Sequence, residues 1–243
     1  MVGMSKAKME NKALPKRFYL EALAAPSGEG WGIFLDGKPV KTPARNTLHI
    51  ADKAIADAVA EEWREQKDVI DPEAMPLTRL ANITQDRVPV DRALLIDDIA
   101  RYAETDLVCY HAPSSEKLGR LQHATFEPLL EWGRVAFALD FVATDSIMPI
   151  MQTPETLANA RALIEQATDR ELAALAMMVP LLGSYLLAVA LWKGRIDIEQ
   201  ALKAARLDED LHAEKYGVDE EAAAAWAARE KDIRASAFFL THN

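Results

Sequence analysis

The stretches VAEEWREQ (residues 59–66), IDPEAMPLTRLANITQDRV (residues 70–88) and ARYAETDLVCY (residues 100–110) are the most informative part of the chain. They hold no catalytic motif. Apolar residues recur at helical spacing within them, which predicts helices over residues 53–66, 75–87 and 90–102. The short apolar run Leu107 to Tyr110 predicts a strand that returns to an earlier sheet.

The residues before this stretch have the pattern of a small sheet. We expect strands over residues 17–23, 31–35, 39–42 and 47–50, with a tight hairpin turn at Asp36-Gly37. The composition of residues 25–30 (APSGEG) predicts a mobile loop. So small a sheet buries little by itself, and the amphipathic helix over residues 53–66 is the nearest element to cover it.

The residues after this stretch are mainly helical in pattern. A helix is expected over residues 118–139, interrupted at Pro128, and another begins at Thr153-Pro154. Asp197 with Gln200 caps a helix that runs over residues 198–216 and ends at Gly217, and a last helix covers residues 219–239. We therefore predict an α+β fold: an N-terminal domain of sheet and covering helices (residues 14–116), followed by an all-α helical bundle (residues 117–240).

The segment Leu172 to Trp192 (LAALAMMVPLLGSYLLAVALW) has no charged residue and is long enough to cross a bilayer. Pro180 and Gly183-Ser184 interrupt it, and the mean hydropathy of the chain is −0.10. We favour a buried helix or a broken helical pair in a core over a membrane span.

Composition limits the partners. With 38 acidic and 28 basic side chains the formal net charge is −10, which repels nucleic-acid phosphates and anionic lipids. The single cysteine, Cys109, forms no internal disulfide. Residues 1–12 have neither the apolar segment of a secretion signal nor the pattern of an organellar presequence, so we interpret them as a flexible start and expect a cytoplasmic protein.

The candidate catalytic and metal-binding motifs lack residues that their chemistry requires. Residues 32–38 (GIFLDGK) have phosphate-loop spacing, but Pro39 replaces the hydroxyl residue and the pattern is strand, turn, strand. The five histidines are scattered in sequence, which gives no metal motif. Cys109 is expected to be a packed thiol. We predict no catalytic residue, no cofactor and no metal, although a site assembled from distant carboxylates and histidines stays open.

Carboxylates gather near the C-terminus. Asp208, Glu209 and Asp210 are followed by Glu214, and a solvated helix face or a site for a basic partner both fit this pattern. Trp63 and Arg79 are open to two interpretations in the same way, as a core residue and an internal ion pair or as contacts for a partner.

Several separated motifs resemble the F1-ATPase assembly chaperone family, in the branch that binds the α subunit. The similar segments are Phe18-Tyr19, residues 35–43 (LDGKPVKTP), residues 59–63 with Gln66, residues 75–82 with Asp86-Arg87, residues 102–110, Gln122 and, more loosely, residues 207–217. In that last segment His212 and Tyr216 stand where glutamine and tryptophan are more usual, and Ala223-Ala224 replaces a His-Asp pair.

The resemblance implies a two-domain protein without a cofactor, monomeric when free, that binds the unassembled α subunit and prevents its aggregation until the β subunit replaces it. It implies a partner surface, for which we predict Asp208, Glu209, Asp210, Glu214, Trp63 and Arg79. Two rivals are an enzyme with a composite carboxylate and histidine site, and an assembly factor anchored in the membrane by residues 172–192.

Overall fold

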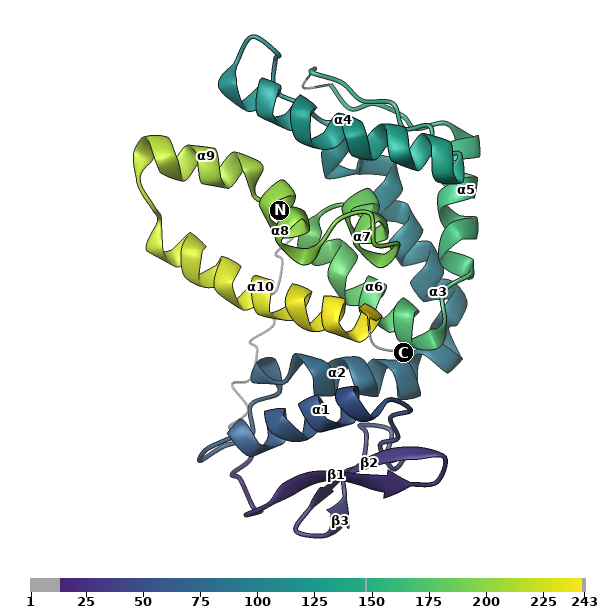
Figure 1. Cartoon of the computed structure of the whole chain (residues 1–243), viewed down its shortest axis with the longest axis vertical. Helices are drawn as coiled ribbons and strands as arrows, with labels where there is room; N and C mark the ends of the chain where they lie inside the picture. The colour runs from purple at the N-terminus through teal and green to yellow at the C-terminus, as the bar shows by residue number, and fades with distance from the viewer. Residues whose placement is uncertain (1–13, 147, 242–243) are drawn as a thin grey trace, which may run out of the picture.

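The computed structural model describes residues 14–146 and 148–241, and the predicted flexible start over residues 1–12 lies outside them. Its elements are a small antiparallel sheet at one end and a larger group of helices stacked upon it (Figure 1). The predicted α+β class is confirmed. The predicted division at residues 116 and 117 stays a prediction, and α3 (Val88–Arg101), which precedes it, packs against α5 (Pro154–Glu165) and α6 (Asp169–Leu182).

The sheet has the order β1 (Ala22–Ser27), β2 (Gly30–Leu35), β3 (Lys38–Pro39). The predicted hairpin turn at Asp36-Gly37 is confirmed, and both residues have positive φ, 46° and 77°. The predicted mobile loop over residues 25–30 is wrong, because β1 continues to Ser27 and turns at Gly28 (φ 61°). Pro26 fits there because β1 is an edge strand, which can spare one N–H group.

Three predicted strands are shorter than expected, and the one predicted over residues 39–42 corresponds to β3, which ends at Pro39. Residues before Ala22 lie along residues 68–70, where the Arg17 amide donates to Asp68 O at 2.9 Å and the Ile70 amide donates to Pro15 O at 2.8 Å. Residues 47–50 form only isolated bridges, Thr47 with Lys41 and Ile50 with Trp31. The first predicted strand therefore contributes its last residues alone to the sheet.

Helix α1 (Lys53–Glu65) covers the sheet as predicted (Figure 1). The Asp52 side chain caps it by accepting from the Ile55 amide, and Ile55 and Val59 lie on its buried face. A 3-10 turn, η1 (Pro72–Ala74), leads into α2 (Pro76–Asn82), the π-helix η2 (Ile83–Arg87) and α3, so the two helices predicted over residues 75–102 are confirmed with a π-helical turn between them.

The predicted strand over residues 107–110 is wrong. The chain forms two 3-10 turns, η3 (Tyr102–Thr105) and η4 (Leu107–Cys109), and the Asp106 carboxylate accepts from the Val108 amide at 3.1 Å. Tyr110 bridges Thr144 and not the first sheet. Apolar runs of this length occur both in strands and in buried turns, and here the hydrogen bond to the Asp106 side chain favours the turn.

Helix α4 (Lys117–Phe137) passes through Pro128 without the predicted interruption. Proline at this position removes one hydrogen bond to the carbonyl of Ala124, and both residues are exposed, so water can solvate that carbonyl. Helix α5 begins at Thr153 as predicted, and the Thr153 side chain accepts from the Thr156 amide.

The apolar segment is a broken helical pair, one of the two predicted forms. The predicted interruption at Gly183-Ser184 is confirmed, and the one at Pro180 is wrong because α6 continues through it to Leu182. Helix α6 ends at Gly183 (φ 67°), and Ser184 caps α7 (Tyr185–Trp192) through the Leu187 amide. All of α7 except Trp192 is buried, whereas α6 buries one face and leaves Asp169 and Pro180 exposed. In residues 14–146 and 148–241, none of the helices has both the length and the apolar character that a bilayer span requires. The segment forms the centre of the core (Figure 1).

The helix predicted over residues 198–216 is two helices, α8 (Ile198–Ala205) and α9 (Leu207–Tyr216), because the chain bends at Arg206. The capping box of Asp197 with Gln200 and the end at Gly217 are as predicted. Helix α10 (Glu220–Thr241) then runs back beside α9 and continues across α6 and α2 (Figure 1).

Candidate functional site

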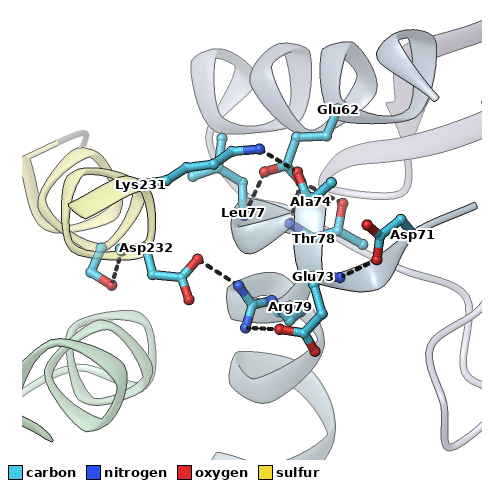
Figure 2. Close-up of polar contacts among 10 residues, drawn as sticks. Glu62, Asp71, Glu73, Ala74, Leu77, Thr78, Arg79, Lys231 and Asp232 are labelled. Atoms are coloured by element: carbon cyan, nitrogen blue, oxygen red, sulfur yellow. Dashed lines mark hydrogen bonds and ion pairs between the residues drawn. The ribbon is translucent and has the colours of Figure 1, made fainter. Parts of the chain in front are cut away.

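The Glu62 carboxylate, from the first informative stretch, organises the junction of α1, α2 and α10 (Figure 2). Its oxygens accept from the amides of Leu77 at 2.7 Å and Thr78 at 2.8 Å, and from the Thr78 hydroxyl at 2.8 Å. Met75, at the start of α2, makes no side-chain capping hydrogen bond, so Glu62 of α1 caps α2 in its place. Burial raises the pKa of Glu62, and these hydrogen bonds and the charge of Lys231 partly offset the rise.

Arg79 and Trp63 make internal contacts at the same junction. The Arg79 guanidinium lies 2.6 Å from the Asp232 carboxylate of α10, and the Lys231 ammonium donates to Ala74 O at 2.7 Å (Figure 2). Trp63 packs edge-on against Tyr19 with ring centroids 5.8 Å apart, and the Tyr19 hydroxyl donates to Trp63 O at 2.6 Å. These contacts join the sheet end of the molecule to the last helix.

The predicted carboxylates lie elsewhere, on α9. Asp208, Glu209 and Asp210 occupy its exposed first turn, where negative charge favours a helix N-terminus. Asp210 pairs with Arg206 at 3.0 Å, and Glu214 pairs with Lys117 of α4 at 2.7 Å. The structure therefore separates the six predicted partner residues into this acidic group and the α1–α2–α10 junction.

A groove of about 750 Å³ separates α9 from the first half of α10, and we call it the α9–α10 groove. Trp226 is its half-buried centre, with the Arg206 guanidinium 4.9 Å and the Arg229 guanidinium 5.9 Å from the ring. Tyr216 and Val218, 66% and 71% exposed, lie where α9 turns into α10. The other lining residues are Asp208, Glu209, His212, Ala213, Gly217, Asp219, Ala222, Ala223 and Ala225.

Sequence reasoning missed the apolar part of this groove. Trp226 within EEAAAAWAAR (residues 220–229) was an available signal, since one tryptophan among alanines and charges has few neighbours on its own helix to pack against. The groove combines a carboxylate rim with an aromatic and alanine floor. Such a surface can accept a protein segment that carries both basic and apolar side chains.

Three buried groups with large pKa shifts lie in the core and not in this groove. Burial raises the pKa of Asp106 to about 6, against hydrogen bonds that include the Leu186 amide at 2.8 Å. Burial also raises the pKa values of Cys109 and Tyr185, and the Tyr185 hydroxyl donates to Ala160 O at 2.8 Å. The Asp106 carboxylate thus accepts hydrogen bonds at a helix start, and the Cys109 and Tyr185 side chains pack in the core.

One group in the described part of the chain has the composition of a metal site. His111, His123 and Glu127 place one possible ligand atom each within 4.8 Å of one another. Sequence reasoning missed this group because the separation of His111 from His123 matches no metal-binding motif. The spacing of His123 and Glu127, four residues apart on α4, was an available signal.

Comparisons with known proteins agree on one family. The model of the ATP12 chaperone protein matches residues 16–134. The crystal structure of Atp12 from Paracoccus denitrificans is 35% identical, with a TM-score of 0.82 over 93% of this chain and 97% of that chain. The chain belongs to the ATP12 chaperone family.

Two further relatives extend the ATP12 comparison. A structure described as a putative chaperone from Agrobacterium tumefaciens is 38% identical, with a TM-score of 0.86 over 94% of this chain and 86% of that chain. The mitochondrial protein atp12 of Schizosaccharomyces pombe is 25% identical over 203 residues, 78% of this chain and 69% of that protein. The predicted membership of the F1-ATPase assembly chaperone family is confirmed. The matched residues 16–134 contain the α1–α2 part of the junction, and the α9–α10 groove lies beyond them.

Proposed function

We propose that this ATP12 family protein is an ATP-independent assembly chaperone that binds the unassembled α subunit of F1-ATPase in the cytoplasm. It acts as a monomer and without a cofactor, and it catalyses no covalent reaction. It covers the subunit until the β subunit takes its place. The observation that carries the proposal is the α9–α10 groove, with its acidic rim and apolar floor in a member of this family.

The surface suits the physical task of an assembly chaperone. A subunit taken out of an obligate oligomer exposes a large apolar interface that self-associates. Tyr216, Val218 and Trp226 offer apolar area, and the alanines of α10 let another backbone approach closely. Reversible cover of a sticky interface needs this contact area and no nucleotide.

The carboxylates have a different task in this proposal. Asp208, Glu209 and Asp210 stand in water, where charges steer and orient a partner more than they add affinity. Asp208 and Glu209 line the groove, and Asp210 lies beside them in the same turn, paired with Arg206 of the groove. We propose that they guide a basic side of the α subunit onto the groove, and that Trp63 and Arg79 contribute through the junction that supports α10.

The test mixes the purified protein with isolated α subunit or isolated β subunit and follows aggregation by light scattering. We expect the α subunit to stay soluble and the β subunit to aggregate as it does alone. The triple variant Asp208→Lys, Glu209→Lys, Asp210→Lys should capture α more weakly while it keeps its fold.

The matched control reverses three exposed carboxylates at the sheet end, Glu29→Lys, Glu65→Lys and Asp68→Lys, with the same change in net charge. It should protect α as the unchanged protein does. If the α9 variant protects equally well, the role of the acidic group is wrong. If the unchanged protein does not protect α, the proposed function itself is wrong.

A further inference from the structure

The segment that follows η4 is held firmly against the N-terminal half of α4. The Ala112 amide donates to the Gln122 side chain at 2.6 Å. Gly119 is buried at the contact, and a Cβ there would come within 2.2 Å of Pro113 O, so this close approach requires glycine. Side chains that face each other across this contact therefore have fixed backbones.

His111 is placed and oriented by the same segment. It is 8% exposed, and its ring lies edge-on to His123 with centroids 4.5 Å apart. Its Nε2 atom lies 2.9 Å from Val108 O. A carbonyl oxygen only accepts, so Nε2 carries a proton, and Nδ1 is the ring nitrogen whose lone pair a neutral imidazole can offer to a ligand. No hydrogen bond within the described residues uses Nδ1.

His123 and Glu127 complete the group from one face of α4. They are four residues apart, and His123 Nδ1 lies 3.5 Å from Glu127 Oε1. Both side chains are partly exposed, 41% and 57%, so their rotamers can adjust at little cost. Donor atoms around tetrahedral Zn²⁺ lie about 3.3 Å apart, given bonds of about 2.0 Å. The three possible ligand atoms lie within 4.8 Å of one another, and rotamer changes of His123 and Glu127 can shorten these distances.

We propose that His111, His123 and Glu127 form a binding site for Zn²⁺ or a similar divalent transition metal ion. Two imidazoles and a carboxylate are a known zinc donor set, with water in the fourth position. The hydrogen bond from His111 to a backbone carbonyl is the outer contact that orients such ligands. The ion would join the segment at residues 107–116 to α4, which is independent of the proposed capture of a subunit.

The experiment uses the full chain without an affinity tag, freed of metal by a chelator. Zn²⁺ is titrated by calorimetry, and Co²⁺ is added as an absorbing substitute. We expect one equivalent of Zn²⁺ and the visible absorption of tetrahedral Co²⁺. His123→Ala should weaken binding by more than about 100-fold and Glu127→Gln by at least about 10-fold, because loss of an outer partner alone costs about 10- to 100-fold.

Two control variants have matched chemistry. Glu131→Gln changes the next carboxylate along α4, and His212→Ala removes an exposed imidazole of α9. Both should bind Zn²⁺ as the unchanged protein does. Zn²⁺ should also slow hydrogen exchange of the amides at residues 107–116, and this effect should vanish in His123→Ala.

Three results would overturn the site. The unchanged chain could take up less than one equivalent, His123→Ala and Glu127→Gln could bind as well as their controls, or the bound ion could protect a different segment. Variants at exposed positions are used because removal of the buried His111 ring would disturb folding as well as binding.

Discussion

The two halves of α10 do opposite work on one continuous helix. In the second half Ile233, Ser236 and Phe239 are buried, and Lys231 and Asp232 bind η1 and α2. In the first half the alanines are mostly exposed and Trp226 forms the floor of an open groove. The contrast indicates that the helix is anchored at one end so that its other end can present a surface.

The energetics of the two halves differ for the same reason. At the α1–α2–α10 junction the Glu62 carboxylate is buried and hydrogen-bonded, and the ion pair of Arg79 with Asp232 is mostly buried, so removal of one partner leaves another unsatisfied. Around the α9–α10 groove the polar groups are in water, where substitution changes the free energy of unfolding little. The predictions below test this difference, in order of the expected effect on stability.

Glu62→Ala should have the largest effect. It leaves the amides of Leu77 and Thr78 and one hydroxyl without an acceptor at a buried helix start, so we expect a loss of about 3 kcal/mol in the free energy of unfolding. Urea denaturation measures it. The neighbouring control Glu61→Ala is exposed and should stay within about 0.5 kcal/mol. Equal losses in both variants would contradict the capping role.

The buried Asp106 extends the comparison to pH. Its pKa rises from 3.8 unfolded to about 6 folded, so the folded protein binds the proton more tightly. Stability from this group is therefore present below about pH 4 and is lost as the pH rises to about 6, by up to about 3 kcal/mol. Asp106→Asn should lose this part of the pH dependence. Urea denaturation of both proteins at pH 4.5 and pH 7 tests it, and parallel pH profiles would refute it.

The ion pair of Arg79 with Asp232 should contribute less. Its side chains are 27% and 18% exposed, so solvent screens it in part, and we expect a coupling of about 1 kcal/mol in a double-mutant cycle to alanine. The exposed pair Lys53 with Asp57 is the control and should couple by about 0.3 kcal/mol. If the two cycles agree, the junction does not strengthen its ion pair. Loss of α capture in proportion to lost stability would identify Arg79 as a support and not a contact.

Local signals in the sequence predicted most of the elements. Asp36-Gly37, Thr153 and the pair Asp197 with Gln200 were recognised because a turn or cap is decided by residues next to it. The Leu107 to Tyr110 segment was misassigned because the deciding group, Asp106, also binds the Leu186 amide, 80 residues away.

The candidate sites were harder to predict for the same reason. The acidic group was visible as a run of letters, but the groove exists because the chain bends at Arg206 and returns along α10. His111 meets His123 because two segments cross at Gly119. Contacts between distant segments depend on the whole fold, which a single sequence does not display.

Trp226→Ala should change stability least and binding most. The ring is half-buried at the groove, so we expect a loss below about 1 kcal/mol in unfolding but at least about 10-fold weaker capture of the α subunit, as at an aromatic anchor. Val135→Ala on α4, 71% exposed, is the control and should change neither stability nor capture.

The salt dependence of capture separates the apolar contribution of Trp226 from the contribution of the acidic group, because salt screens only the charges. Capture by Trp226→Ala should thus keep the salt dependence of the unchanged protein, and the triple lysine variant of α9 should lose it. If both variants lost the salt dependence, Trp226 and the acidic group would not contribute separately to capture. The first half of α10 would then not present an apolar surface of its own.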